Sequence, residues 1–271
     1  MLFRVSFAAL ILFSLVNAAS AQVVRFETTV GSFDMVLNPT GNSRLQGHVN
    51  NMLAYVNNNN YNSSWINRAD TGFVLQMGGF HSHTKRPPAT IESTRPVDSF
   101  APIFGEPGIT GLSNTVGTVS LALSGGAGGT NQDSGSSSFF VNLTSNSFLD
   151  ADFTVFAAIP DMTVVNQIMA LTTVDKTADP VFGAGSGNLG FSDIPVTASG
   201  FQVFIKRAFV INDAMSVARA NAGVQSVMAL SQSGGGGGSA SASVVPEPAS
   251  IFLAAVAAIG ALLGARRPRR F

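Results

Sequence analysis

The chain has 271 residues, of which 45% are hydrophobic and only 11% are charged. Its 15 basic and 15 acidic residues balance, so there is no basic field to hold a phosphate backbone, and no nucleic-acid partner is expected. The absence of cysteine excludes disulfides, thiolate metal sites and thiol catalysis.

Residues 1–21 have the pattern of a secretory signal peptide. Arg4 precedes a mostly apolar run, Val5–Val16, and Ala19-Ser20-Ala21 supplies the small residues of a cleavage site. The alternative is a membrane anchor, for which the apolar run is too short. We therefore predict export, with Gln22 as the first mature residue.

The folded domain is predicted over residues 22–212 and is mainly β. Val30-Gly31 is typical of a hairpin turn, so the domain is expected to open with two antiparallel strands. Alternating or short apolar runs predict strands at 23–29, 32–37, 65–66, 73–77, 118–123, 139–143, 153–159 and 201–210.

Helical spacing predicts two helices, over 45–56 and 163–171. About eight strands with only two helices exclude a βαβ repeat. A chain of this kind closes a barrel or stacks two sheets in order to hide its strand edges. Two long polar stretches, His81–Gly111 and Thr173–Gly200, are predicted to be loops that line a site or are disordered.

Residues 213–243 are predicted to be a stalk and linker. Asn212–Leu230 has a weak apolar stripe suited to a stalk helix, and the Gly/Ser-rich run Ser231–Ser243 is typical of a flexible tether. Both lie outside the predicted folded domain, so we expect them to separate that domain from the C-terminal segment.

Residues 244–271 combine three features in a fixed order. Val245-Pro246-Glu247-Pro248 is followed by the apolar run Ala249–Ala265 and then by four arginines, at 266, 267, 269 and 270. This order resembles the PEP-CTERM sorting signal, which implies recognition and removal by an exosortase-type membrane enzyme. The alternative is a permanent tail anchor, with the arginines on the cytoplasmic side. Either alternative predicts a location in the cell envelope or on the extracellular surface, with transient or permanent anchoring in the inner membrane.

One arginine stands at the head of a motif in the middle of the domain. Ile66-Asn67-Arg68 is followed, after a short turn, by Phe73-Val74-Leu75-Gln76-Met77-Gly78. Four further segments occur in a matching order, at 23–37, 114–123 (NTVGTVSLAL), 137–143 (SSFFVNL) and 146–156 (NSFLDADFTVF). Together they resemble the cyclophilin family of peptidyl-prolyl cis-trans isomerases across 23–210.

The resemblance implies a closed eight-stranded antiparallel barrel, capped by two helices, with the site on its outer face. Arg68 matches the catalytic arginine, and Gln76 matches the glutamine that supports the arginine and the substrate backbone. The positions that match substrate-binding residues are Phe73, Val74, Leu121, Ala122, Phe140, Phe148, Leu149 and Phe153. The family acts on proline-containing polypeptides, and we expect a monomer with no cofactor or metal.

Three residues depart from the family pattern. Asn67 replaces the motif histidine, Met77 replaces the first glycine after the glutamine, and Ser138 replaces a groove glutamine. Two functions therefore stay open. The first is non-covalent isomerisation of X-Pro bonds in exported proteins, with Arg68 donating to the prolyl nitrogen in an apolar pocket. The second is a non-catalytic cyclophilin-like binding or surface matrix protein.

Overall fold

The computed structural model describes residues 21–82, 94–126, 129–179 and 189–233. Most of the predicted signal peptide and all of the predicted sorting segment lie outside these ranges. Within the described ranges, no helix combines the length and the hydropathy that a membrane crossing requires.

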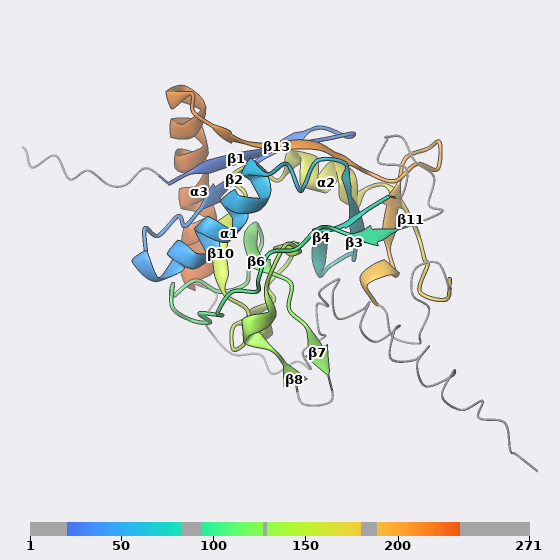
Figure 1. The fold of residues 1–271 in the computed structure, drawn as a ribbon. Coiled ribbons are helices and arrows are strands. Elements are labelled where there is room, and N and C mark those ends of the chain that lie inside the picture. The colour runs from blue at the N-terminus through green and yellow to red at the C-terminus, as the bar shows by residue number, and fades with distance from the viewer. Residues whose placement is uncertain (1–20, 83–93, 127–128, 180–188, 234–271) are drawn as a thin grey trace, which may run out of the picture.

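Eight antiparallel strands make up the body of the molecule (Figure 1). They are β1 (Val23–Thr28), β2 (Ser32–Leu37), β3 (Ser64–Ala69), β4 (Val74–His81), β6 (Thr118–Leu121), β9 (Phe139–Asn142), β10 (Val155–Ala158) and β13 (Ile205–Ile211). Their order in the sheet is β13-β1-β2-β10-β6-β9-β4-β3. The first two strands form the predicted antiparallel hairpin.

The two edge strands of this sheet meet. Trp65 of β3 forms a bridge with Phe204, just before β13. Beside that bridge, the Ile66 amide donates to the Val203 carbonyl at 2.9 Å. The sheet is therefore a nearly closed barrel, which leaves few unpaired edge groups. The predictions of a mainly β fold and of eight antiparallel strands are confirmed.

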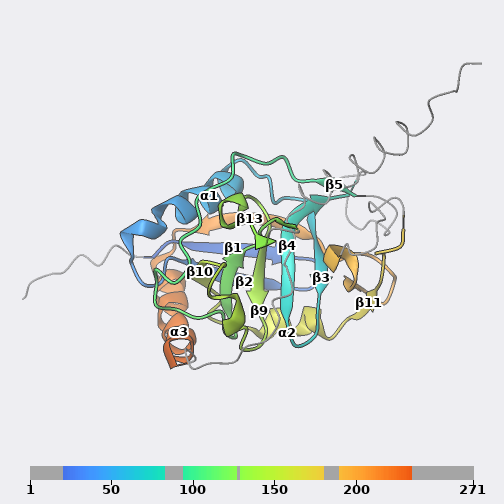
Figure 2. The same cartoon turned by 90° about the horizontal axis from the view of Figure 1, so that it is seen from below.

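Two helices, α1 (Gln46–Asn57) and α2 (Thr163–Met169), lie on opposite sides of the barrel (Figure 2). Each points apolar side chains into the main core: Met52 and Val56 come from α1, and Val165 and Ile168 come from α2. Strand residues that face inward complete this core, because side chains alternate between the two faces of a strand. The two predicted capping helices are thus present.

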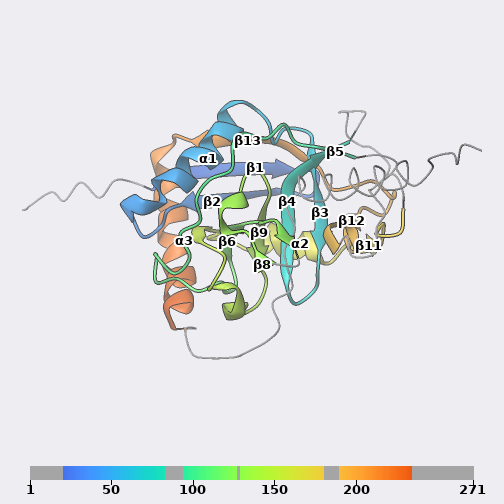
Figure 3. The ribbon, with the colours of Figure 1, turned by 60° about the horizontal axis from the view of Figure 1, so that its bottom comes forward.

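A third helix, α3 (Ala214–Ser233), covers the outer face of the barrel along β2, β10 and β6 (Figure 3). Its buried residues Ala220, Val224 and Val227 recur at helical spacing and pack against Val23 and Val36. The sequence predicted a stalk here. The structure instead docks this segment on the barrel, so the folded part continues past residue 212.

Shorter elements lie between these strands and helices. β5 (Arg95–Pro96) and β12 (Ile194–Val196) fall in the two stretches that were predicted as loops, and β12 pairs antiparallel with β11 (Thr172–Val174). β7 (Gly125–Gly126) pairs antiparallel with β8 (Gly129–Thr130). The described residues also include four short 3-10 helices: η1 (Ser43–Leu45), η2 (Gln132–Ser134), η3 (Ser147–Leu149) and η5 (Leu189–Phe191).

Candidate active site

Arg68, Gln76 and Phe140 lie opposite one another on three neighbouring strands. Arg68 of β3 pairs with Gln76 of β4, which pairs in turn with Phe140 of β9. Directly opposite residues share one face of a sheet. The adjacent residues Leu75 and Met77 belong to the main core inside the barrel. The row formed by Arg68, Gln76 and Phe140 is therefore on the outer face.

A β-bulge places Arg68 in this row. The register between β3 and β4 shifts between Ile66, which pairs with Met77, and Arg68. Ile66 faces the barrel interior, and in a regular strand a residue two positions later would face the same way. The extra residue, Asn67, is fully buried, and its Nδ2 donates to the Gly190 carbonyl at 2.9 Å. The bulge therefore turns the arginine outward and is itself held in place.

The guanidinium of Arg68 is almost completely buried, with a side-chain exposure of 4%. Its central carbon lies 5.3 Å from the centroid of the Phe73 ring, a distance suited to a cation–π contact. Its Nη2 donates to Oδ2 of Asp70 at 2.6 Å. Among the described residues, its Nε and Nη1 are buried without a hydrogen-bond partner. The arginine thus keeps two donors beside an aromatic face.

An apolar cluster lies next to this row. Its buried members are Val74, Ala122, Leu123, Phe140, Leu149 and Phe153, with Phe73 and Phe148 partly buried against them. The Phe140 and Phe153 rings meet edge to face, with centroids 5.6 Å apart. Phe73 and Phe148 are stacked at 6.1 Å. The cluster therefore reaches the surface through an aromatic pair and is suited to hold an apolar ring beside the arginine.

A family model for cyclophilin type peptidyl-prolyl cis-trans isomerase/CLD matches residues 23–182. The chain belongs to the cyclophilin family. A peptidyl-prolyl cis-trans isomerase of Acinetobacter baylyi is 32% identical over 163 residues, which are 58% of this chain and 77% of that protein. Peptidyl-prolyl cis-trans isomerase B of Escherichia coli is 31% identical over 160 residues, which are 56% of this chain and 86% of that protein.

Among solved structures, a cyclophilin type peptidyl-prolyl cis-trans isomerase of Cryptosporidium parvum matches with a TM-score of 0.48 and 19% sequence identity. The match covers 71% of this chain and 99% of that chain. From the family model and the curated relatives, the chain is a peptidyl-prolyl cis-trans isomerase.

The structure brings the predicted site residues of this cyclophilin together, with one exception. Leu121 packs in the main core inside the barrel, and its neighbour Ala122 belongs to the apolar cluster. The alternation of the strand explains the difference, because adjacent residues face opposite sides. Leu123 joins the cluster and was not predicted. Its apolar character was a signal in the sequence, but it was read as part of a strand core.

Besides Asn67, the residues that depart from the family pattern are Met77 and Ser138, and each has a local explanation. Met77 fills the barrel core, away from the outer row. Gly78, at a φ of +83°, is the glycine that the strand needs, because a Cβ there would lie 2.8 Å from the Ser137 carbonyl oxygen. Ser138 Oγ accepts from Gln76 Nε2 at 3.2 Å. The serine therefore contacts the glutamine of the row.

Asn114 is hydrogen-bonded to several polar side chains next to the apolar cluster, and this group of side chains is called the polar layer. Its backbone amide and its Nδ2 both donate to Oδ1 of Asp150, at 2.7 and 2.9 Å. Its Oδ1 accepts from Ser120 Oγ at 2.8 Å and from Asn142 Nδ2 at 3.1 Å. The amide Nδ2 also lies 3.3 Å from the Phe153 carbonyl. This one side chain therefore connects β6 and β9 with the segment that carries Phe153.

Asn146 extends this layer to the aromatic rim. Its Nδ2 donates to Oδ1 of Asn142 at 2.8 Å and to the Phe73 carbonyl at 3.0 Å. Its backbone amide donates to the Asn114 carbonyl at 2.7 Å. Sequence reasoning missed these asparagines as a group, because the chain is rich in asparagine and only their burial distinguishes them.

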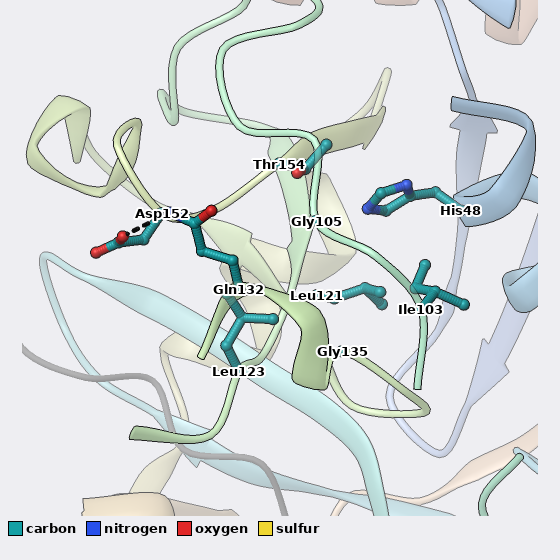
Figure 4. Close-up of a pocket in the computed structure, with 9 residues that line it drawn as sticks. All are labelled: His48, Ile103, Gly105, Leu121, Leu123, Gln132, Gly135, Asp152 and Thr154. Atoms are coloured by element: carbon teal, nitrogen blue, oxygen red, sulfur yellow. Dashed lines mark hydrogen bonds between the residues drawn. The ribbon is translucent and has the colours of Figure 1, made fainter. Parts of the chain in front are cut away.

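A small cavity of about 10 Å³ lies beside Leu123 of the cluster (Figure 4). The His48 ring points into it from α1, and Gln132 donates to Asp152 at 3.0 Å on the opposite side. Leu123 and Thr154 also line it. Burial lowers the pKa of His48 to about 4, so this ring is neutral near pH 7. The cavity has room for about one water molecule.

Proposed function

We propose that Arg68 catalyses rotation about X-Pro bonds by donating a hydrogen bond to the prolyl nitrogen, and that the clients are exported proteins. The observation that carries the mechanism is the outer row, in which Arg68 stands beside Gln76 and Phe140. The arginine there has two buried nitrogens without a partner in the described part of the chain. A ring held on the apolar cluster would lie next to these donors.

The chemistry needs no covalent step. Amide resonance opposes rotation with a barrier of about 18–20 kcal/mol. As the bond twists, the prolyl nitrogen recovers its lone pair and can accept a hydrogen bond that neither planar state offers. A donor placed at that nitrogen therefore stabilises the twisted state selectively, and only such differential binding accelerates the reaction. A guanidinium is permanently charged, and its field is strong beside buried aromatic rings.

The test compares two arginines in the full-length chain with a proline-peptide isomerisation assay. Arg68→Ala should lower kcat/KM about 100-fold, which corresponds to about 2.7 kcal/mol of lost transition-state stabilisation. Arg25→Ala is the matched control, because Arg25 also forms an ion pair with an aspartate but lies on the barrel wall at β1 and β2. Arg25→Ala should leave the rate unchanged.

A binding measurement separates catalysis from recognition. Arg68→Ala should still bind a proline peptide through the apolar cluster, because the cluster does not depend on the guanidinium. Equal isomerisation rates in Arg68→Ala and the parent chain would refute the role of the arginine. Peptide binding without isomerisation in the parent chain would support the non-catalytic alternative.

The proposal of exported clients depends on the two ends of the sequence. The signal-peptide pattern of residues 1–21 and the sorting pattern of 244–271 both support a site of action in the cell envelope. Mass spectrometry of the protein recovered from a bacterium with an outer envelope should find Gln22 as the first residue. Processing at the C-terminal end would support an exosortase-type partner, and an intact end in the inner membrane would support a permanent anchor. Recovery from the cytoplasm with Met1 in place would overturn export.

A further inference from the structure

A carboxylate stands directly beside the proposed catalytic arginine. Asp70 is the first residue of the tight turn that joins β3 to β4. Its amide donates to the Val74 carbonyl and its carbonyl accepts from the Phe73 amide, both at 3.0 Å. Gly72 completes the turn with a φ of +76°. The backbone on which the carboxylate stands is therefore held at both of its hydrogen-bonding groups.

The Asp70 side chain contacts one corner of the guanidinium. Its Oδ2 accepts from Nη2 of Arg68 at 2.6 Å. The aspartate side chain is 30% exposed, whereas that of Arg68 is 4% exposed. The other two guanidinium nitrogens, Nε and Nη1, are buried and have no partner among the described residues. The carboxylate thus occupies one nitrogen and leaves the N–H groups of the other two without an acceptor among the described residues.

We propose that Asp70 is a positioning residue, which fixes the guanidinium of Arg68 in the outer row and leaves Nε and Nη1 for the substrate. This inference rests on the proposed role of Arg68. An arginine side chain loses up to about 2 kcal/mol of rotamer entropy when it is ordered, so an anchor that orders it before the substrate arrives removes that cost from the reaction.

An opposing effect is that the carboxylate reduces the positive field of the arginine. Asp70 is partly solvated, which weakens a pairwise charge interaction. It also contacts Nη2 alone, so it does not occupy Nε and Nη1, the donors that the substrate would use. Orientation should therefore outweigh charge reduction.

The experiment measures kcat and KM for a proline peptide in the full-length chain. Asp70→Ala should lower kcat about tenfold while KM changes less than about threefold, because orientation acts on the transition state. Asp70→Asn keeps an oxygen that can accept from Nη2 and should retain kcat within about threefold of the parent. Asp70→Glu keeps the charge but moves the acceptor by one methylene, and it should lie closer to Asp70→Ala.

The matched control is Asp34→Ala. Asp34 accepts from Arg25 Nε at 2.7 Å and from Nη2 at 2.9 Å, so the variant breaks a comparable ion pair away from the site. It should leave kcat unchanged. Thermal unfolding of each variant shows whether a loss of kcat reflects unfolding, and if Asp70→Ala does not fold, the comparison of Asp70→Asn with Asp70→Glu decides.

Three results would overturn the proposal. The first is an Asp70→Ala rate at or above that of the parent, which would mean that the carboxylate competes with the substrate. The second is an Asp70→Asn rate as low as that of Asp70→Ala. The third is an Asp70→Glu rate equal to that of the parent. The double variant Arg68→Ala/Asp70→Ala should match Arg68→Ala alone. If Arg68→Ala itself keeps full activity, the proposed function fails, and that result is distinct from a failure of the Asp70 inference.

Discussion

The two sides of the active site are built in opposite ways. The cation side lies on β3 and β4. There Arg68 makes one side-chain hydrogen bond, to Asp70, and two of its nitrogens are buried without a partner among the described residues. On the wall side, Asn114 alone takes part in contacts to Asp150, Ser120 and Asn142. The cation side is thus incompletely satisfied, and the wall side is densely bonded.

This difference fits the division of labour in the proposed reaction. A wall that grips a ring works best when it is rigid, and a satisfied polar layer behind it supplies rigidity. A donor for a transition state must keep unused hydrogen-bonding capacity until the substrate provides an acceptor. The unsatisfied donors of Arg68 lower the stability of the free protein, and they are the feature that the substrate would complete.

The largest effect on the wall side is expected from Asn114→Ala. The change leaves the buried Ser120 hydroxyl without its acceptor and removes a donor to the Asp150 carboxylate, whereas Asn142 Nδ2 keeps Thr118 as an acceptor. The first loss costs about 1–3 kcal/mol and the second about 1.5–3 kcal/mol, so we expect a loss of about 4 kcal/mol in the free energy of unfolding. Urea denaturation measures it, and KM for a proline peptide should rise because Phe153 loses its support.

Asn58→Ala is the control for this prediction. Asn58 is exposed at the end of α1 and makes one side-chain hydrogen bond, to the Ala54 carbonyl. Its removal should change stability by about 0.5 kcal/mol or less. A loss below about 1 kcal/mol in Asn114→Ala would show that the polar layer does not determine the rigidity of the wall.

Acid should weaken the wall side next. His48 has a pKa of about 4 in the folded protein and an ordinary value of 6.5 when unfolded. Its stabilising contribution is complete above pH 6.5 and is lost as the pH falls through about 4, because the unfolded chain takes up the proton first. The parent should lose about 3 kcal/mol from this group over that range.

The measurement is urea denaturation of the parent and of His48→Gln between pH 7 and pH 4. The difference in the free energy of unfolding between the two proteins isolates His48 from the other titrating groups. This difference should shrink or change sign as the pH falls. Equal losses of unfolding free energy in both proteins would contradict the assignment of this pH dependence to His48. The guanidinium of Arg68 stays charged throughout, so the cation side should not contribute.

The sequence predicted most of the barrel, because the periodicity of apolar residues marks strands without reference to other parts of the chain. Strand alternation located β1 and β2, and helical spacing located α1 and α2. The docking of α3 could not be predicted from its weak stripe. Its partners Val23 and Val36 lie on the outer face of β1 and β2. The inner face of these two strands packs in the main core, and this already explained why the strands are apolar.

Some residues of the site could be predicted from the sequence and others could not, because some contacts depend on distant parts of the chain. Motif order located Arg68, Gln76 and Phe140, and the strand register brings these three together. The bulge at Asn67 and the contact of Asp70 depend on a register shift and on a turn geometry that residue types do not encode. Leu121 and Ala122 were taken together from one matched segment, and the alternation of the strand turns only Ala122 toward the apolar cluster.

The smallest expected effect tests whether α3 supports the wall side. Ser231 is 1% exposed, and its hydroxyl donates to the Ser113 carbonyl at 2.5 Å, while the Ser113 hydroxyl donates to Asp150. Ser231→Ala should lower the free energy of unfolding by about 1 kcal/mol. Ser233→Ala, at an exposed serine bonded only within the helix, should have no effect. If Ser231→Ala also raises KM and leaves kcat unchanged, the helix stabilises the wall through Asp150 and does not influence Arg68. A fall in kcat at constant KM would instead connect α3 to the cation side, and the two halves of the site could no longer be treated as separately built.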